Sequence, residues 1–397
     1  MPAALEVNHA NGTADLVAEP ELVPEGVPPD AKPDEDDISR IFAAWGLSQD
    51  EWEIDGNLIW ANSWPMVIAA GDIKVFRQWK AKLRKRHTRS DVNQVLEGVR
   101  RMRPRKNRAP AAAGRVRNFV VADPQMGKAA VGGSERIVNR WMDSVQQTLD
   151  SEMRARRMGY GTDRLIIPLM GDLIENCTSG HQSQHYEIDL HLTDQVKVVH
   201  ECIWQTIKAM APEWESVQVA AAPGNHGEAA RIGKGAQNST MPSDNWDVAI
   251  PDMVRRSIAE MAPDGVFDHV EWFMPHSEEL TVVMPISDSL TLGMAHGHQF
   301  AGGKGDPLVK ALNWWKEHLV NDAETELAHV DVMLVGHFHH FRIQRSGTRT
   351  LILCPSLENE EGSRWFQNKT GANCPPGALT FILDADHPWP VRQLEVN

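Results

Sequence analysis

Five short apolar runs, each followed at once by polar side chains, constrain this sequence more than any other feature. The runs are rich in Val, Ile, Leu and Ala, which is typical of strands buried in a parallel sheet. Amphipathic segments such as 137–153 and 196–210 lie between several of them, so strands alternate with helices. This alternation predicts an α/β layered domain. The five runs are Phe119–Ala122, Leu165–Met170, Val217–Ala222, Leu290–Ala295 and Val330–Val335.

The polar residues that follow the runs are of the types that bind metal ions. Carboxylate, carboxamide and imidazole groups together suit a borderline-hard divalent ion such as Mn, Fe or Zn. Ligand sites of α/β folds form at the carboxyl ends of the strands, so five such positions in order indicate one shared pocket. Any one of these residues alone would be better explained as a buried, hydrogen-bonded side chain. They are Asp123 and Gln125, Asp172, Asn225 and His226, His296, and His337 and His339.

The order of these motifs resembles that of the calcineurin-like metallophosphoesterases, which read D-x-H, G-D-x-x-D, G-N-H-[DE], H and G-H-x-H. The corresponding segments here are VADPQMG, MGDLIEN, PGNHGE, AHGHQ and VGHFHH, within residues 119–344. The resemblance implies an α/β fold with a two-sheet sandwich and two divalent metal ions bridged by a carboxylate and a hydroxide. A Trp-rich N-terminal part before this core also resembles bacteriophage-encoded, repair-nuclease-like members.

The same resemblance implies a role for each matching residue. Asp172 would bridge both ions and act in catalysis with the metal-activated hydroxide that attacks phosphorus. His226 would be catalytic rather than a ligand, meeting the leaving oxygen or a non-bridging phosphoryl oxygen. The first ion would be held by Asp123, Gln125, Asp172 and His339, and the second by Asp172, Asn225, His296 and His337.

Three positions depart from the family pattern. Gln125 replaces a histidine, and because an amide oxygen is a harder donor than imidazole, Mn is expected over Zn, with Fe, Ni and Mg as alternatives. Glu175 stands where the second motif has Asp, which is a mild change. Gly227 follows His226 where an acidic residue is usual, so the orientation of His226 stays open.

The net charge of −14 hides a strongly basic segment. Between Lys74 and Arg117 there are 16 Lys and Arg against two acidic residues. Such a block predicts nucleic-acid binding, because Lys and Arg neutralise phosphates and release counterions. The alternative is a solvated charged helix and linker without a dedicated partner. Protein partners and the oligomeric state stay open.

Composition predicts four segments. Residues 1–37 hold ten acidic residues, six prolines and one lysine, and are expected to be disordered. Residues 38–72 are expected to form a small helical module. Residues 73–117 are expected to form a basic helix and linker, because Ile73, Phe76, Trp79 and Leu83 share a helical face. Residues 118–397 would form the catalytic domain. Two late runs, 350–354 and 378–384, are expected to belong to the second half of its sandwich.

The remaining features concern location and a second cluster. The four cysteines form no CxxC pair, and no apolar run approaches the roughly 20 residues that span a bilayer. We therefore expect a cytoplasmic protein without membrane association, in the host cytoplasm if phage-encoded. Cys177, His181 and His185 are spaced by four, and the cluster is open to two interpretations, a substrate-side group or polar surface.

The leading functional hypothesis is a dinuclear metal-dependent phosphoesterase that hydrolyses phosphodiester bonds in nucleic acid. A phosphomonoesterase or small-nucleotide phosphodiesterase is the second enzyme hypothesis. A scaffold that kept the fold and lost the chemistry is a third. The sequence leaves open the physiological metal, DNA versus RNA, and exo- versus endonucleolytic cleavage.

Overall fold

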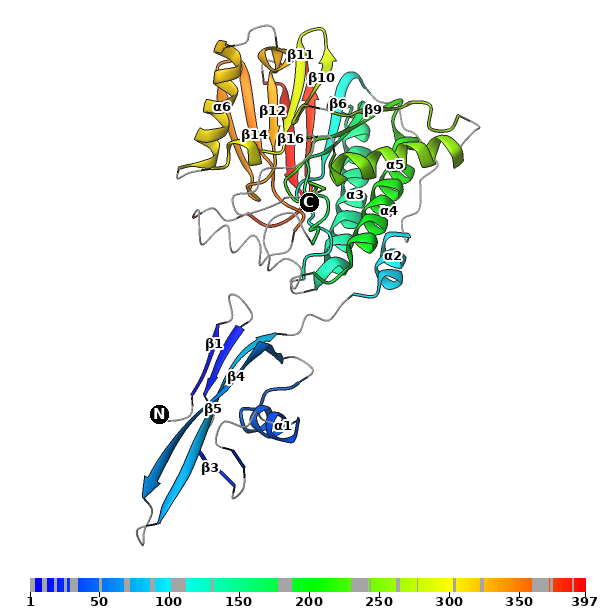
Figure 1. Ribbon diagram of the computed structural model, residues 1–397. Helices are drawn as coiled ribbons and strands as arrows, with labels where there is room; N and C mark the ends of the chain where they lie inside the picture. The colour runs from blue at the N-terminus through cyan, green and yellow to red at the C-terminus, as the bar shows by residue number, and fades with distance from the viewer. Residues whose placement is uncertain are drawn as a thin grey trace. The chain divides into compact units, whose positions relative to one another are not determined.

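The protein is described by a computed structural model, in which the chain divides into two compact units, Met1–Thr88 and Arg89–Asn397 (Figure 1). The structure describes residues 4–8, 13–17, 20–24, 27–28, 35–49, 52–67, 72–85, 90–100, 112–129, 132–177, 188–229, 242, 244–261, 265–276, 278–302, 305–321, 325–358, 371, 374–387 and 389–397.

The larger unit contains two β-sheets. The first has six strands, in the order β16 (Val391–Val396), β15 (Leu379–Asp384), β6 (Ala112–Val120), β7 (Thr162–Leu169), β8 (Ser216–Ala221) and β9 (Val270–Phe273). The second has five, in the order β10 (Thr281–Ser287), β11 (Leu290–Ala295), β12 (Val332–Val335), β14 (Arg349–Leu353) and β13 (Arg342–Ser346). Strands β6 to β9 run parallel, as do β11, β12 and β14.

Helices cover the outer face of each sheet, as Figure 1 shows. An apolar cluster joins the first sheet to the helices on its outer face, with Trp141 and Trp214 fully buried in it. A second cluster lies between the sheets, where Ile166 and Phe381 meet Met294 and Leu334. These layers make the unit an α/β sandwich. The helices are α2 (Val92–Arg100), α3 (Gly133–Arg157), α4 (Leu192–Met210) and α5 (Trp246–Met261) on the first sheet and α6 (Pro307–Asn321) on the second.

The sequence predicted most of this unit. All five apolar runs lie in or directly beside strands β6, β7, β8, β11 and β12, and both amphipathic segments are helical. One expectation was wrong, because the run at 378–384 contains β15 (Leu379–Asp384), which lies in the first sheet, antiparallel to β6, rather than in the second. The alternation of apolar residues marks a strand but does not say which sheet it joins.

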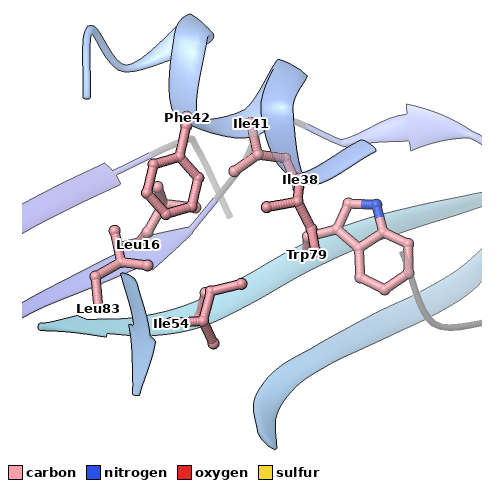
Figure 2. Close-up of a pocket in the computed structure, with 8 residues that line it drawn as sticks. Leu16, Ile38, Ile41, Phe42, Ile54, Trp79 and Leu83 are labelled. Carbon is pink, nitrogen blue, oxygen red and sulfur yellow. The ribbon is translucent and has the colours of Figure 1, made fainter. Parts of the chain in front are cut away.

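The smaller unit is a β-sheet covered on one face by helix α1 (Glu35–Ala44). The long strands β4 (Trp52–Val67) and β5 (Ile73–Lys85) pair along most of their length. Strands β1 (Ala4–Asn8), β2 (Thr13–Val17) and β3 (Glu21–Leu22) complete it, in the order β1-β2-β5-β3. Figure 2 shows apolar side chains of α1, β2, β4 and β5 pointing towards one another. The void they enclose is only about 10 Å³, so they form a core rather than a ligand site.

The structure differs here from four expectations. Residues 38–72 form a helical module only in part, because residues 52–67 form strand β4, which pairs with β5. Residues 1–37 contain strands rather than a disordered tail, because β2 and β3 pair with β5. Residues 73–85 form a strand rather than a helix, since Trp79, Ala81 and Leu83 bury one face at the period of two. The boundary between the two compact units falls after Thr88 in the sequence rather than after residue 117, because α2 packs with α3 and α4. Much of the expected 103–114 linker lies outside the described residues.

The basic segment is therefore split between the two units. Several of its arginines form ion pairs, including Arg77 with Glu21 at 2.6 Å and Arg84 with Glu53 at 2.6 Å. Arg117 is fully buried and contacts Glu152 at 3.1 Å. Burial lowers the pKa of Arg117, and Glu152 counters that effect. These arginines serve the fold of each unit. Lys74, Lys80 and Lys82 of β5 are further cations of the segment among the described residues.

No helix among the described residues is both long and apolar enough to cross a membrane.

Candidate metal centre

The predicted ligand residues lie at the carboxyl ends of strands that come from both sheets. Asp123, Asp172 and Asn225 follow β6, β7 and β8 of the first sheet, while His296 and His337 follow β11 and β12 of the second. The two sheets pack face to face, as Figure 1 shows, so these strand ends lie together at one edge of the sandwich. Side chains more than two hundred residues apart in sequence thus converge, as His337 N shows by donating to Asp123 Oδ1 at 3.0 Å.

The four residues expected around the second ion form a compact donor set. Ligand atoms of Asp172, His296 and His337 lie within 4.8 Å of one another. His296 Nε2 is 3.2 Å from Asp172 Oδ2 and 3.2 Å from Asn225 Oδ1. Bonds of about 2.0–2.1 Å to a tetrahedral ion put its ligand atoms roughly 3.3–3.4 Å apart. These residues therefore fit a divalent ion.

Of the two histidines of this set, His296 is oriented by a hydrogen bond and His337 is kept neutral by its surroundings. His296 Nδ1 lies 2.8 Å from the carbonyl oxygen of Met170, which fixes Nε2 as the atom that faces the other donors. Burial, together with the neighbouring His296, lowers the pKa of His337 well below its ordinary value. His337 is therefore neutral, the form that binds metal. A side chain at Gly171, whose φ is 88°, would lie 2.8 Å from His296 Nδ1, so glycine is required there.

The residues expected around the first ion converge less completely. His339 Nε2 is 3.3 Å from Asp123 Oδ1, so these two side chains could share an ion. His339 Nδ1 is 2.6 Å from Glu358 Oε2, the carboxylate–histidine arrangement that orients a metal ligand. The carboxamide oxygen of Gln125, however, accepts a hydrogen bond of 2.8 Å from Lys128 Nζ. Asp123 and His339 thus fit a metal ion, whereas Gln125 is also engaged by a cation of the protein.

His226 lies beside the donor set and is oriented by Glu175. Its Nδ1 is 3.3 Å from Glu175 Oε2, and its Nε2 is 3.9 Å from Asp172 Oδ2. Burial lowers the pKa of His226, but the carboxylates of Glu175 and Asp172 outweigh burial and raise it to about 10. Glu175 therefore supplies the orienting carboxylate that Gly227 cannot, because the longer Glu side chain reaches the ring from the preceding strand end.

A buried carboxylate that sequence reasoning missed ties the loops together. Asp247, the second residue of α5, accepts backbone N–H bonds from Asp172 at 2.8 Å, Leu173 at 2.8 Å and Gly224 at 2.9 Å. Burial and the neighbouring Asp172 raise the pKa of Asp247 to about 7. No local sequence pattern marks Asp247, because it lies inside an ordinary amphipathic helix.

Glu358 was also missed, although a sequence signal exists for it. It follows β14 closely, as the five ligand motifs follow their strands, and its side chain is fully buried. Burial would raise the pKa of Glu358, but Lys128 and His339 lower it to about 2. Glu358 is thus a carboxylate that faces the centre from a sixth strand end.

The backbone at the centre is strained. Asp123, Gln125 and Asp172 have φ values of 47°, 44° and 50°, in the left-handed region that side chains rarely adopt. Each such residue costs on the order of 1–3 kcal/mol, and strain of this kind gathers at functional sites. Six of the seven described non-glycine residues with positive φ lie at the centre: Asp123, Gln125, Asp172, Asn176, His337 and His339.

Of the cluster Cys177, His181 and His185, only Cys177 is among the described residues. Cys177 is half-buried, and burial raises the pKa of its thiol. His181 and His185 lie outside the described residues, so the interpretation of this cluster stays open.

Comparison with known proteins gives distant structural likenesses. No model of a protein family matches the sequence, and no curated protein matches it. Among solved structures, Vacuolar Protein Sorting 29 from Cryptosporidium parvum is 12% identical with a TM-score of 0.29, covering 68% of this chain and 86% of its own. A novel archaeal phosphodiesterase is 11% identical with a TM-score of 0.30, covering 71% and 99%. A putative 5'-nucleotidase from Staphylococcus aureus is 9% identical with a TM-score of 0.29, covering 71% and 53%. An assignment of activity therefore depends on the side chains described above.

Proposed function

We propose that this protein is a dinuclear metal-dependent phosphodiesterase that acts on nucleic acid. The observation that carries the proposal is the convergence of Asp172, Asn225, His296 and His337 on one ion-sized volume, with His226 beside it. Carboxylate, amide and imidazole donors of this kind suit Mn, Fe or Zn. When bound, such ions polarise the phosphoryl oxygens and lower the pKa of water.

The protein's own residues position the reacting groups. Asp172 presents Oδ2 to the donor set while its Oδ1 accepts the backbone N–H of His226 at 2.8 Å. This bond couples the carboxylate to the loop that carries the proposed acid. Glu175 contacts Nδ1 of His226, so Nε2 is the ring atom on the side of Asp172, where it would donate a proton to the leaving oxygen. A phosphodiester bound here would thus have the metal-binding residues on one side and the proton donor His226 on the other.

A panel of substrates tests this proposal against the alternatives. The purified protein is assayed with bis-p-nitrophenyl phosphate, p-nitrophenyl phosphate, and single- and double-stranded DNA and RNA, each with Mn, Mg, Zn and Ni. We expect hydrolysis of the diester and of a nucleic acid, with Mn most effective. Preferential hydrolysis of p-nitrophenyl phosphate would favour a phosphomonoesterase. Hydrolysis of bis-p-nitrophenyl phosphate without hydrolysis of nucleic acid would favour a small-nucleotide phosphodiesterase. Absence of hydrolysis with every metal would favour the scaffold.

The smaller unit offers a surface for the nucleic acid. Strand β5 buries its odd-numbered residues from Trp79 to Leu83 under α1, so its even-numbered residues lie on the opposite face. Lys74 and Lys82 are exposed there and Lys80 is half-buried. Phe76 and Trp64, directly paired across β5 and β4, add two half-buried aromatic rings. Cations that neutralise phosphates, combined with aromatic rings that stack on bases, are typical of single-strand binding surfaces.

Removing the three lysine charges should weaken nucleic-acid binding without changing the chemistry. In the Lys74→Gln/Lys80→Gln/Lys82→Gln variant, the log–log dependence of DNA affinity on salt should flatten by about two to three units, at roughly 0.7–0.9 per phosphate. Fluorescence anisotropy of labelled oligonucleotides over a salt series measures this slope. Hydrolysis of bis-p-nitrophenyl phosphate should stay unchanged, because the lysines lie in a different unit from the metal centre.

The matched control changes three lysines of the larger unit, Lys197, Lys208 and Lys316, to Gln. These side chains lie on α4 and α6. The control should retain the wild-type slope. An unchanged slope in the β5 variant would show that this face is solvated surface, and the small-substrate alternative would gain.

A further inference from the structure

Lys128 connects the residues of the first metal position in a way that the ligand motifs do not indicate. The backbone N–H of Lys128 donates to the carbonyl oxygen of Gln125 at 3.1 Å, so both residues belong to one tight turn after β6. Lys128 Nζ donates to Gln125 Oε1 at 2.8 Å. The only amide oxygen among the expected ligands of the first ion is therefore already held by an ammonium group.

Glu358 holds the lysine in this position. It forms an ion pair with Lys128 through Oε1, and its Oε2 is 2.6 Å from Nδ1 of His339. The Glu358 side chain is fully buried, while that of Lys128 is 29% exposed, so the lysine enters the centre from its solvent side. The Glu358 carboxylate thus orients His339, one expected ligand of the first ion. It also anchors Lys128, whose ammonium group contacts Gln125, another expected ligand.

The backbone around Glu358 leaves it little freedom to move. Ser356 Oγ donates to the carbonyl oxygen of Asp123 at 2.9 Å and accepts from the N–H of Glu358 at 2.8 Å. Arg140 Nη1 donates to the carbonyl oxygen of Glu358 at 2.8 Å. The arrangement is therefore built into the fold rather than left to a mobile surface side chain.

We propose that Lys128 sets the order in which the two metal sites fill, by competing with the first ion for the carboxamide oxygen of Gln125. A divalent ion on that oxygen would lie within a few ångströms of the ammonium group, and like charges at this range repel strongly in a buried site. The second site, formed by Asp172, Asn225, His296 and His337, binds the tighter ion. This inference rests on the proposed function for the presence of two ions, and it adds a residue that makes them unequal.

The test measures metal binding without any substrate. Metal-free full-length protein is titrated with MnCl₂ by calorimetry, and spin-coupled manganese pairs are counted by electron paramagnetic resonance. Wild type should bind one ion tightly and a second weakly. Lys128→Met should tighten the weak event by about 10–100-fold, the range for changes beside metal ligands, and leave the tight event unchanged. The spin-coupled signal should then appear at lower manganese concentration.

Three further variants separate charge from structure. Lys128→Arg keeps the positive charge and should behave as wild type, whereas Lys128→Gln should behave as Lys128→Met. Glu358→Gln removes the carboxylate that offsets the ammonium group, so the weak event should weaken further. Lys197→Met, on the exposed surface of α4, is the matched control and should change neither event.

The proposal would be overturned if the second manganese ion bound with unchanged or weaker affinity in both Lys128→Met and Lys128→Gln. It would also be overturned if wild type bound both ions equally tightly. Thermal melting of each metal-free variant shows whether it is folded, and Lys128→Gln keeps the test decisive if Lys128→Met is not. Because no substrate is present, absence of phosphodiesterase activity would leave this result unaffected. Failure of the proposed function and failure of this inference are therefore distinguishable.

Discussion

Asp172→Asn should reduce diester hydrolysis by more than about 10³-fold, beyond the 10²–10³-fold cost of losing one donor to the transition state. Asp172 is nearly fully buried and places one carboxylate oxygen among the donors of the second site. The Asn side chain keeps the shape and can still accept the N–H of His226, but it loses the negative charge. Its amide is a weaker metal ligand, so metal content should fall together with activity.

Metal analysis of the dialysed Asp172→Asn protein provides the second readout. Asp194→Asn on α4, where the aspartate forms an exposed ion pair with Lys197, is the matched control and should retain both metal and rate. Two ions per chain in the Asp172→Asn protein would contradict the proposed role. So would wild-type hydrolysis at saturating manganese.

His226→Gln should lower kcat by about 10²–10⁴-fold, the usual share of a positioned acid. Unlike Asp172, His226 is half-buried and is not expected to bind an ion, so metal content should remain that of wild type. The physical reason is specific to the leaving group. A substrate whose alcohol leaves readily without a proton, such as bis-p-nitrophenyl phosphate, should lose less than DNA does.

Comparing those two substrates therefore distinguishes a proton donor from a structural residue, which would affect both equally. His200→Gln is the matched control, because His200 is half-buried on α4 and contacts Ser257 at 3.3 Å. An unchanged DNA hydrolysis rate in His226→Gln would show that another group protonates the leaving oxygen. Loss of metal with the activity would make His226 a ligand instead.

Sequence patterns predicted the larger unit well and the smaller unit poorly. In the larger unit, apolar runs of buried parallel strands are nearly continuous and carry a strong signal. In the smaller unit, Ile73, Phe76, Trp79 and Leu83 fit a helical face, yet they lie in a strand. Pairing with β2, β3 and β4 decided that outcome, because the tertiary context of a strand overrides its local propensity.

The sequence alone singled out the ligand-type residues that the structure brings together, such as Asp172 and His296, since they directly follow buried strands and such strand ends share one edge of the fold. Only the tertiary structure decided how these side chains are supported. Asp247, Glu358 and Lys128 reach the centre from a helix, a sixth strand end and a tight turn, and their contacts span up to 230 residues between Lys128 and Glu358. Hydrogen bonds and ion pairs of this kind depend on how the layers pack, and no periodicity along the chain encodes that packing.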